Sequence, residues 1–85
     1  MKGRYTVLWH GDARNDLAQV WLDAPDRAAV TEAAREIDKR LSRSPSTEGV
    51  SLSEGLWALI EPPLQLAYEV READRVVEVA FVKRI

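Results

Sequence analysis

The pattern of apolar and polar positions is clearest in the C-terminal third of the chain, where it predicts three consecutive strands. Residues 64–70 alternate between large apolar side chains and smaller or polar ones, as in a strand with one buried and one exposed face. Residues 76–82 are β-branched and almost continuously apolar, which is typical of a central strand. Residues 56–60 form a third apolar run. Short connections at 61–63 and 71–75 predict that the three strands pair as an antiparallel meander.

The first half of the chain predicts one strand followed by two helices. Residues 4–10 alternate in the manner of a strand, and one face of it carries Tyr5, Val7 and Trp9. A helical period follows from residue 13 to residue 21, and a second apolar stripe covers residues 29–41. Asp12 is suited to cap the first helix, and Pro25 to stand near the start of the second. Because so few residues separate the two helices, we expect an antiparallel helical hairpin.

These elements predict a two-layer α+β fold in a single domain that spans residues 1–85. The helical hairpin must bury its two apolar stripes, and the only surface available to it is one face of the antiparallel sheet. Residues 44–54 are rich in Ser, Thr, Pro and Gly and have no clear period, so they are predicted to form a solvated loop. The opposite face of the sheet is expected to be open.

Composition limits the chemistry that the chain can perform. An apolar fraction of 46% and a charged fraction of 31% are those of an ordinary globular protein. The absence of cysteine excludes disulfides and thiolate ligands, and a single histidine argues against zinc, so we expect neither a metal nor a cofactor. The net charge of −2 does not indicate a nucleic-acid partner. The apolar run near the N-terminus is too short for a signal peptide or a membrane span, so a cytoplasmic protein without a membrane partner is expected.

Several short motifs follow one another in the order and spacing of a known family. Tyr5-x-Val7-x-Trp9 opens the chain, Ile37-x-x-x-Leu41 is followed by Pro45 and Gly49, and Pro62-Pro63-Leu64-x-x-x-Tyr68-Glu69-Val70 precedes the last strand. Together with the order of the elements, they resemble the RelE/ParE superfamily, the toxins of type II toxin–antitoxin and plasmid-stabilisation modules. The Pro-Pro-Leu turn resembles that of one subgroup. The resemblance covers nearly the whole chain and implies sheet order 1-4-3-2, with the first strand beside the last.

The resemblance also implies partners and an activity. RelE-type toxins cut mRNA on the ribosome with basic residues on the open face of the sheet, and ParE-type toxins inhibit DNA gyrase. Both are neutralised by an antitoxin segment that wraps the domain. In this chain Gln65 and Trp57 stand where relatives carry arginine, and no tyrosine follows Lys83-Arg84. The resemblance therefore implies a cognate antitoxin as partner, without the usual basic nuclease site.

Alternation along the strands predicts which side chains face outward. If Leu64, Leu66, Tyr68 and Val70 face the helices, Gln65 and Glu69 lie on the open face. If Leu56, Ala58 and Ile60 are buried, Trp57 and Glu61 join them, and burial of Val77, Val79 and Phe81 adds Glu78. Carboxylates repel a phosphate backbone, whereas tryptophan is enriched in protein interfaces. We therefore predict a partner-binding surface that contains Trp57, Glu61, Gln65 and Glu69.

Two roles stay open from the sequence alone. In the first, the chain acts mainly by binding its antitoxin. In the second, it is an enzyme, a ribosome-dependent mRNA endonuclease whose rearranged basic site uses Arg4, Lys83 and Arg84; a gyrase-inhibiting toxin is the further alternative. His10 is the only histidine, and no motif surrounds it, so we expect a polar residue at a strand end rather than a general base.

Overall fold

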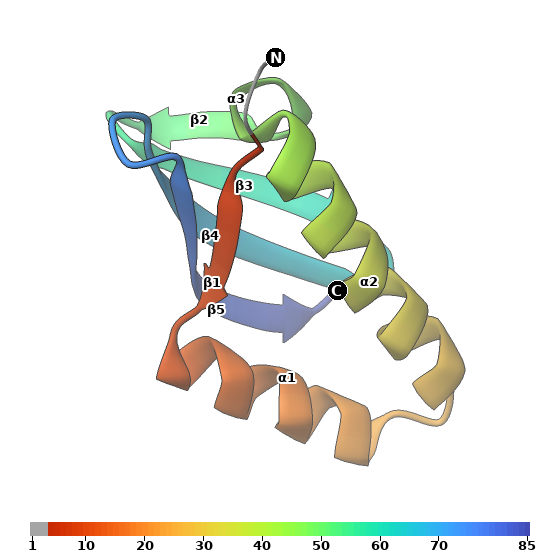
Figure 1. Ribbon diagram of the computed structural model, residues 1–85. Helices are drawn as coiled ribbons and strands as arrows, with labels where there is room; N and C mark the ends of the chain where they lie inside the picture. The colour runs from red at the N-terminus through yellow and green to blue at the C-terminus, as the bar shows by residue number, and fades with distance from the viewer. Residues whose placement is uncertain (1–3) are drawn as a thin grey trace.

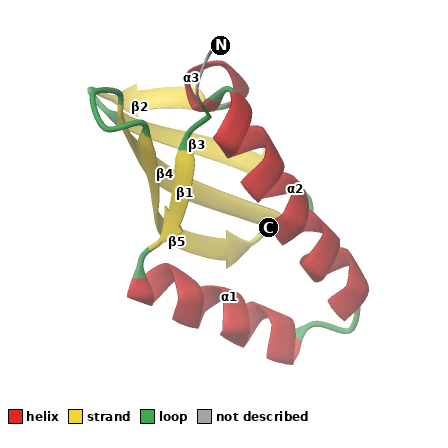
Figure 2. Cartoon of the chain, viewed as in Figure 1, coloured by secondary structure: helices red, strands yellow, loops and turns green. Residues whose placement is uncertain are grey.

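Two long helices lie against one side of a five-stranded sheet in the computed structural model, which describes residues 4–85 (Figure 1). The predicted two-layer α+β architecture is therefore confirmed, as the separation of helices and strands in Figure 2 makes plain. In chain order the elements are β1 (Thr6–Trp9), α1 (Gly11–Asp23), α2 (Arg27–Arg43), α3 (Pro45–Glu48), β2 (Val50–Ser53), β3 (Leu56–Glu61), β4 (Leu64–Arg71) and β5 (Val76–Arg84).

The strands follow the order β1-β5-β4-β3-β2. The four strands predicted from the sequence keep their predicted neighbours, and β2 adds a fifth strand at the edge beside β3. The prediction of an antiparallel sheet is wrong in one respect, because β1 pairs with β5 in parallel. The sheet is therefore mixed. The two helices between β1 and the meander carry the chain across the face of the sheet and allow this parallel pairing.

Residues 44–54 are not the loop that their composition predicts. Pro45 begins the short helix α3, where proline is favoured because its missing N–H would have no helical partner. Residues Val50–Ser53 then pair with β3 as an edge strand. The side chains of β2 are all exposed, which explains why the segment shows no apolar period that could reveal a strand.

The first helix begins one residue before the predicted cap. His10 is the N-cap residue of α1, and its Nδ1 accepts a hydrogen bond from the backbone N–H of Asp12 at 3.3 Å. The prediction that Asp12 caps the helix is therefore wrong, and the side chain of His10 has a structural use. Likewise α2 begins at Arg27 after Asp26, two residues beyond Pro25. Among residues 4–85 no helix combines the length and the apolar content needed to cross a membrane.

The core lies between the helices and one face of the sheet. The apolar stripe of α2 meets alternate residues of β3, β4 and β5, and the predicted inward face of β1 packs beside them. The buried members of this core cluster are Ala13, Ala24, Val30, Ala33, Ile37, Leu41, Leu59, Leu64, Leu66, Tyr68, Val77, Val79 and Val82. The cluster members of α2 and β4 fall on the face that the sequence predicts, although Ala67 of β4 is also buried, on the other face of the sheet. Within residues 4–85, no helix lies on the other face of the sheet (Figure 1).

Candidate functional site: the open face of the sheet

The side chains of β3 point the opposite way from the sequence prediction. Leu59 is buried, and Trp57 packs against the core, so the odd-numbered residues of β3 face the helices. The register confirms this, because Trp57 lies opposite Tyr68 and Leu59 opposite Leu66, both of which are buried. Ile60, predicted to be buried, is 59% exposed. The predicted placement of Trp57 and Glu61 on the open face is therefore wrong.

Glu61 belongs to an ionic cluster at the edge of the helix layer. Arg40 of α2 donates from Nη1 to Glu61 Oε1 at 2.5 Å and from Nε to Glu48 Oε1 at 2.7 Å. The hydrogen bonds to the two carboxylates raise the pKa of Arg40 above its ordinary value, that to Glu48 most. The three side chains are each less than a third exposed and join α2, α3 and β3. Glu61 thus forms its salt bridge with Arg40 of the same chain and helps to stabilise the fold.

A β-bulge in β5 moves Phe81 to the open face. Tyr68 lies opposite Val79, whereas the next residue of β4, Ala67, lies opposite Phe81, so Ala80 has no partner of its own. The extra residue shifts the alternation of β5 by one position. Val77, Val79 and Val82 are therefore buried, while Phe81 is 48% exposed instead of buried as predicted. Glu78 precedes the bulge and faces outward, as predicted.

The strand register arranges the open face into three rows that cross the sheet. The apolar row holds Val50, Ala58, Ala67 and Phe81. On one side of it lies the basic row, Ile60, Gln65 and Lys83, and on the other the acidic row, Leu56, Glu69 and Glu78. Val50 and Phe81 stand as large side chains at the two ends of the apolar row, with the two alanines between them. Ala67 is only 2% exposed, so the accessible apolar surface of this row lies mainly at Val50 and Phe81.

The acidic row continues onto the beginning of α1. A hollow of about 370 Å³ is lined by His10, Asp12, Glu69, Glu78 and Ala80. Glu69 and Glu78 lie directly opposite each other, which is unfavourable for like charges, and Arg71 Nη2 offsets this by donating to Glu78 Oε1 at 2.9 Å. No cluster within residues 4–85 has the geometry of a metal site. The hollow therefore presents negative charge to a partner.

The three basic candidates for a nuclease site lie apart. Lys83 is on the open face, but Arg84 points to the helix side, where its guanidinium forms a salt bridge of 3.0 Å with Asp26 and holds the pKa of that carboxyl below its usual range. Arg4 precedes β1, whose first residue pairs with Val76 at the far end of β5. Lys83 lies seven positions further along β5, or about 23 Å at strand spacing. The structure does not bring Arg4, Lys83 and Arg84 into one site.

Of the predicted partner-binding residues, the structure places Gln65 and Glu69 on the open face and moves Trp57 and Glu61 to the helix side. Sequence reasoning missed Ile60, Phe81 and Val50. Ile60 and Phe81 were assigned to the core, and Val50 was assigned to a loop. A bulge within a continuous apolar strand leaves no signal in the sequence pattern. The outward orientation of Phe81 could therefore not be predicted from alternation.

The comparison with known proteins rests on structure. No protein-family model and no curated protein matches the sequence. Among solved structures, the toxin–antitoxin complex RelBE2 from Mycobacterium tuberculosis matches with a TM-score of 0.81 and 23% identity, covering 100% of this chain and 95% of that chain. The chromosomal ParDE system from P. aeruginosa matches at 0.72 and 18%, covering 95% and 96%. The isolated RelE toxin from E. coli matches at 0.63 and 15%, covering 94% and 83%.

These similarities establish the fold. The predicted resemblance to the RelE/ParE toxins is confirmed for the fold. The isolated RelE toxin has this architecture, and the ParDE and RelBE2 structures each include a chain that has it. The assignment to the Pro-Pro-Leu subgroup stays a prediction. Identities of 15–23% leave the chemistry of the open face to be argued from this chain's own residues.

Proposed function

We propose that this protein is the toxin component of a type II toxin–antitoxin module and acts in the cytoplasm mainly by binding partner proteins, the first of which is its cognate antitoxin. The fold similarity supports the class of protein. The observation that carries the binding role is the apolar row on a face that none of the described helices covers, because Val50 and Phe81 remain 69% and 48% exposed there. Exposed apolar side chains gathered on one face are typical of a protein-binding surface.

Charge on the open face favours a protein partner over a nucleic acid. Phosphate backbones are bound by several lysines and arginines acting together. On this face Lys83 lies beside Gln65, with Ile60 beyond it, while Glu69 and Glu78 supply negative charge on the other side of the apolar row. Arg71 is engaged with Glu78. This distribution supports binding of a polypeptide with an apolar centre, and it gives little support to an mRNA endonuclease that uses Arg4, Lys83 and Arg84.

Expression of the chain alone in a bacterial host tests the proposed class. We expect growth to stop after induction and to resume when the product of the adjacent small gene is expressed as well. A target can then be assigned by measuring translation and DNA supercoiling in the arrested cells, since ribosome-bound mRNA and DNA gyrase are the alternative targets. Undisturbed growth in cells that accumulate folded protein, together with no binding of the adjacent gene product, would refute the proposal.

Variants of the open face test where the antitoxin binds. Phe81→Ser and Ile60→Ser should each weaken the complex by about tenfold or more, equivalent to about 1.4 kcal/mol, because both replace an exposed apolar anchor with a polar side chain. Isothermal titration calorimetry with the purified antitoxin measures the change. Leu22→Ser on α1 is the matched control, because Leu22 is 57% exposed and Ile60 59% exposed. Equal losses for Leu22→Ser and Ile60→Ser would contradict the open-face assignment.

A further inference from the structure

Two charged side chains of the open face have no partner within the part of the chain that the structure describes. Lys83 on β5 and Glu69 on β4 are both exposed, and neither side chain forms a hydrogen bond or a salt bridge with another of residues 4–85. They lie on opposite sides of the apolar row, Lys83 in the basic row and Glu69 in the acidic row. A partner could therefore pair with both of them without breaking a contact of the domain.

The residues on the two sides of the apolar row are complementary to each other in every strand that crosses all three rows. Each of these strands gives one residue to the acidic row and one to the basic row: Leu56 and Ile60 in β3, Glu69 and Gln65 in β4, and Glu78 and Lys83 in β5. The first pair is aliphatic, the second joins a carboxylate to an amide, and the third joins a carboxylate to an ammonium group. The open face is therefore complementary to itself across the apolar row.

A second copy of the chain can use this complementarity when two open faces meet about a twofold axis that runs along the apolar row. The rotation sets each strand against its equivalent in the opposite direction, so that the basic row of one copy lies on the acidic row of the other. Lys83 of each copy then faces Glu78 and Glu69 of the other, and the two Phe81 rings meet at the axis. A twofold axis along the strands would instead set the two acidic rows against each other, which like charges oppose. Of these two arrangements, charge favours only the first.

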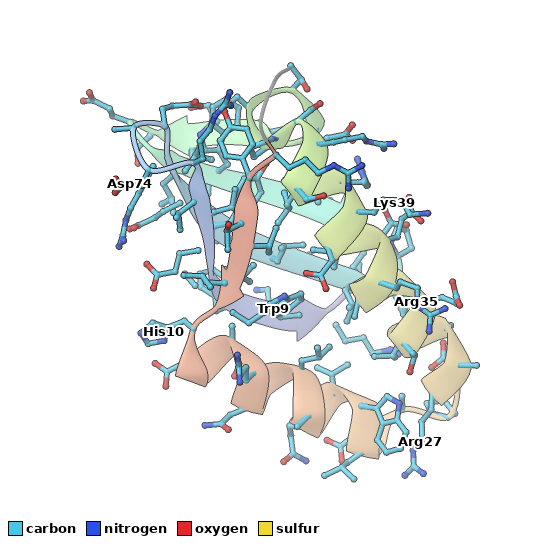
Figure 3. All side chains as sticks on the ribbon, viewed as in Figure 1. Trp9, His10, Arg27, Arg35, Lys39 and Asp74 are labelled. Atoms are coloured by element: carbon cyan, nitrogen blue, oxygen red, sulfur yellow. The ribbon has the colours of Figure 1, made fainter. Side chains whose placement is uncertain are left out.

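The hollow beside the acidic row has room for the lysine of the second copy. Its volume is about 370 Å³, and its lining includes three carboxylates, those of Asp12, Glu69 and Glu78. The one guanidinium that opposes them belongs to Arg71, which donates to Glu78. His10, which Figure 3 shows at the end of β1, adds no positive charge while its Nδ1 accepts the hydrogen bond from the backbone N–H of Asp12. Three negative charges against one positive charge leave the hollow acidic, so an ammonium group suits it.

The size of the open face limits how tightly two copies can bind. Three rows span about 14 Å along the strands, and the four strands that carry the apolar row span about 14 Å across the sheet. This area is smaller than a standard interface, which buries about 800 Å² on each partner. Because Ala67 is already covered by its neighbours, no deep void would remain between the two apolar rows. The dimer is therefore expected to be well packed but weak and reversible.

We propose that a second copy of this chain occupies the open face, in a twofold-symmetric dimer in which the apolar rows meet and Lys83 of each copy enters the acidic hollow of the other. Because the antitoxin is proposed to bind the same face, the dimer and the antitoxin complex would exclude each other. In the dimer, the chain covers its own binding surface. The proposal concerns the chain alone, so it holds or fails independently of the toxin proposal.

Sedimentation equilibrium of the purified full-length chain tests whether the dimer exists. Between about 5 and about 500 µM, the weight-average mass should rise from that of one chain towards that of two, with a Kd on the order of 50 µM for an interface of this size. Phe81→Ser should raise this Kd by about tenfold or more, because it places a hydroxyl group at the apolar axis. A parent chain that stays monomeric at the highest concentration would overturn the proposal and leave the open face to the antitoxin. A dimer that Phe81→Ser does not weaken would overturn it too, because its interface would lie elsewhere.

Exchange of two charges tests the orientation of the copies. Lys83→Glu sets a carboxylate against the acidic row of the second copy, and Glu69→Lys sets an ammonium group against Lys83, so each variant alone should dimerise about tenfold more weakly or worse. An equimolar mixture of the two variants should dimerise about fivefold more tightly than either alone, because the contacts of opposite charge form again between unlike chains.

Lys39→Glu is the matched control for these variants, because it changes the net charge as Lys83→Glu does but lies on α2, as Figure 3 shows. It should leave the Kd of the dimer unchanged, and circular dichroism verifies that each variant is folded. A mixture that dimerises no more tightly than its components would overturn the proposed orientation. Equal weakening by Lys39→Glu and Lys83→Glu would show that net charge, rather than contact across the open face, governs association, and would overturn the proposal.

Discussion

Replacing Trp57 with alanine is expected to lower the free energy of unfolding by about 3 kcal/mol, the cost of truncating a large side chain that packs on a core. Trp57 faces the helices, lies opposite the buried Tyr68 and packs against the core cluster. Its loss would leave a void between β3 and the helix layer that the neighbouring rings cannot fill. Urea denaturation followed by circular dichroism measures the change, because the method does not depend on tryptophan fluorescence.

An outward-facing residue of the same strand, Ile60, provides the control for Trp57. Ile60→Ala on β3 removes an exposed side chain and should change stability by less than about 0.5 kcal/mol. A shift of register by one residue would reverse the two results, because it moves every side chain of a strand to the other face. If Trp57→Ala is stable and Ile60→Ala is destabilised, the register of β3 is wrong. Trp57 would then lie on the open face, and Ile60 would face the helices.

Alternation between apolar and polar residues predicted the faces of the sheet only where it was unambiguous. In β4 the polar residues Gln65 and Glu69 separate large apolar ones, and the predicted faces are correct. In β3 the run Leu56–Ile60 is wholly apolar, so either alternation was compatible with the sequence. The choice depends on pairing with the next strand, which places Trp57 opposite Tyr68 and Leu59 opposite Leu66. Partner-face predictions that relied on β3 were wrong for this reason.

Other features depend on pairing that a single segment does not reveal. The bulge at Ala80 lies in a continuous apolar stretch, and it alone turns Phe81 outward. Strand β2 carries only exposed side chains, so its pairing with β3 is the main reason that it is a strand. The angle between α1 and α2 likewise depends on how the two helices pack, although each helix was predicted from its own apolar period. The fold was thus predictable from element order, whereas the binding surfaces depend on how the elements meet.

The two ion pairs that tie the ends of the sheet to the helices were also beyond sequence reasoning. Arg84 was a candidate for phosphate contact because of its place near the C-terminus, and Glu61 for partner binding because of its assumed face. The structure gives Arg84 the partner Asp26 and Glu61 the partner Arg40, across 58 and 21 residues of sequence. Charged residues near a functional region cannot be assigned to function until such partners are known.

The largest effect of a single added methyl group is expected at Gly49, which joins α3 to β2. A Cβ atom at Gly49 would collide with the hydroxyl of Tyr68 and lie 2.6 Å from the carbonyl oxygen of Ala58. Neither group can move easily. The Tyr68 hydroxyl is buried, donates to the carbonyl of Pro45 at 2.6 Å, and has its pKa raised to about 12 mainly by desolvation. Gly49→Ala should therefore lower the free energy of unfolding by about 3 kcal/mol, as overpacking of a core does.

Gly11→Ala is the matched control for Gly49→Ala, because a Cβ at Gly11 meets nothing within 4 Å and the residue is helical. This change should stabilise the chain by about 0.5 kcal/mol by restricting the unfolded state. Combining Gly49→Ala with Tyr68→Phe should cost less than the sum of the two single changes, because the phenylalanine removes the colliding oxygen. Urea denaturation of the four variants measures this coupling. A Gly49→Ala variant as stable as the parent, or strictly additive costs, would show that α3 and β2 do not pack on Tyr68 as the structure describes.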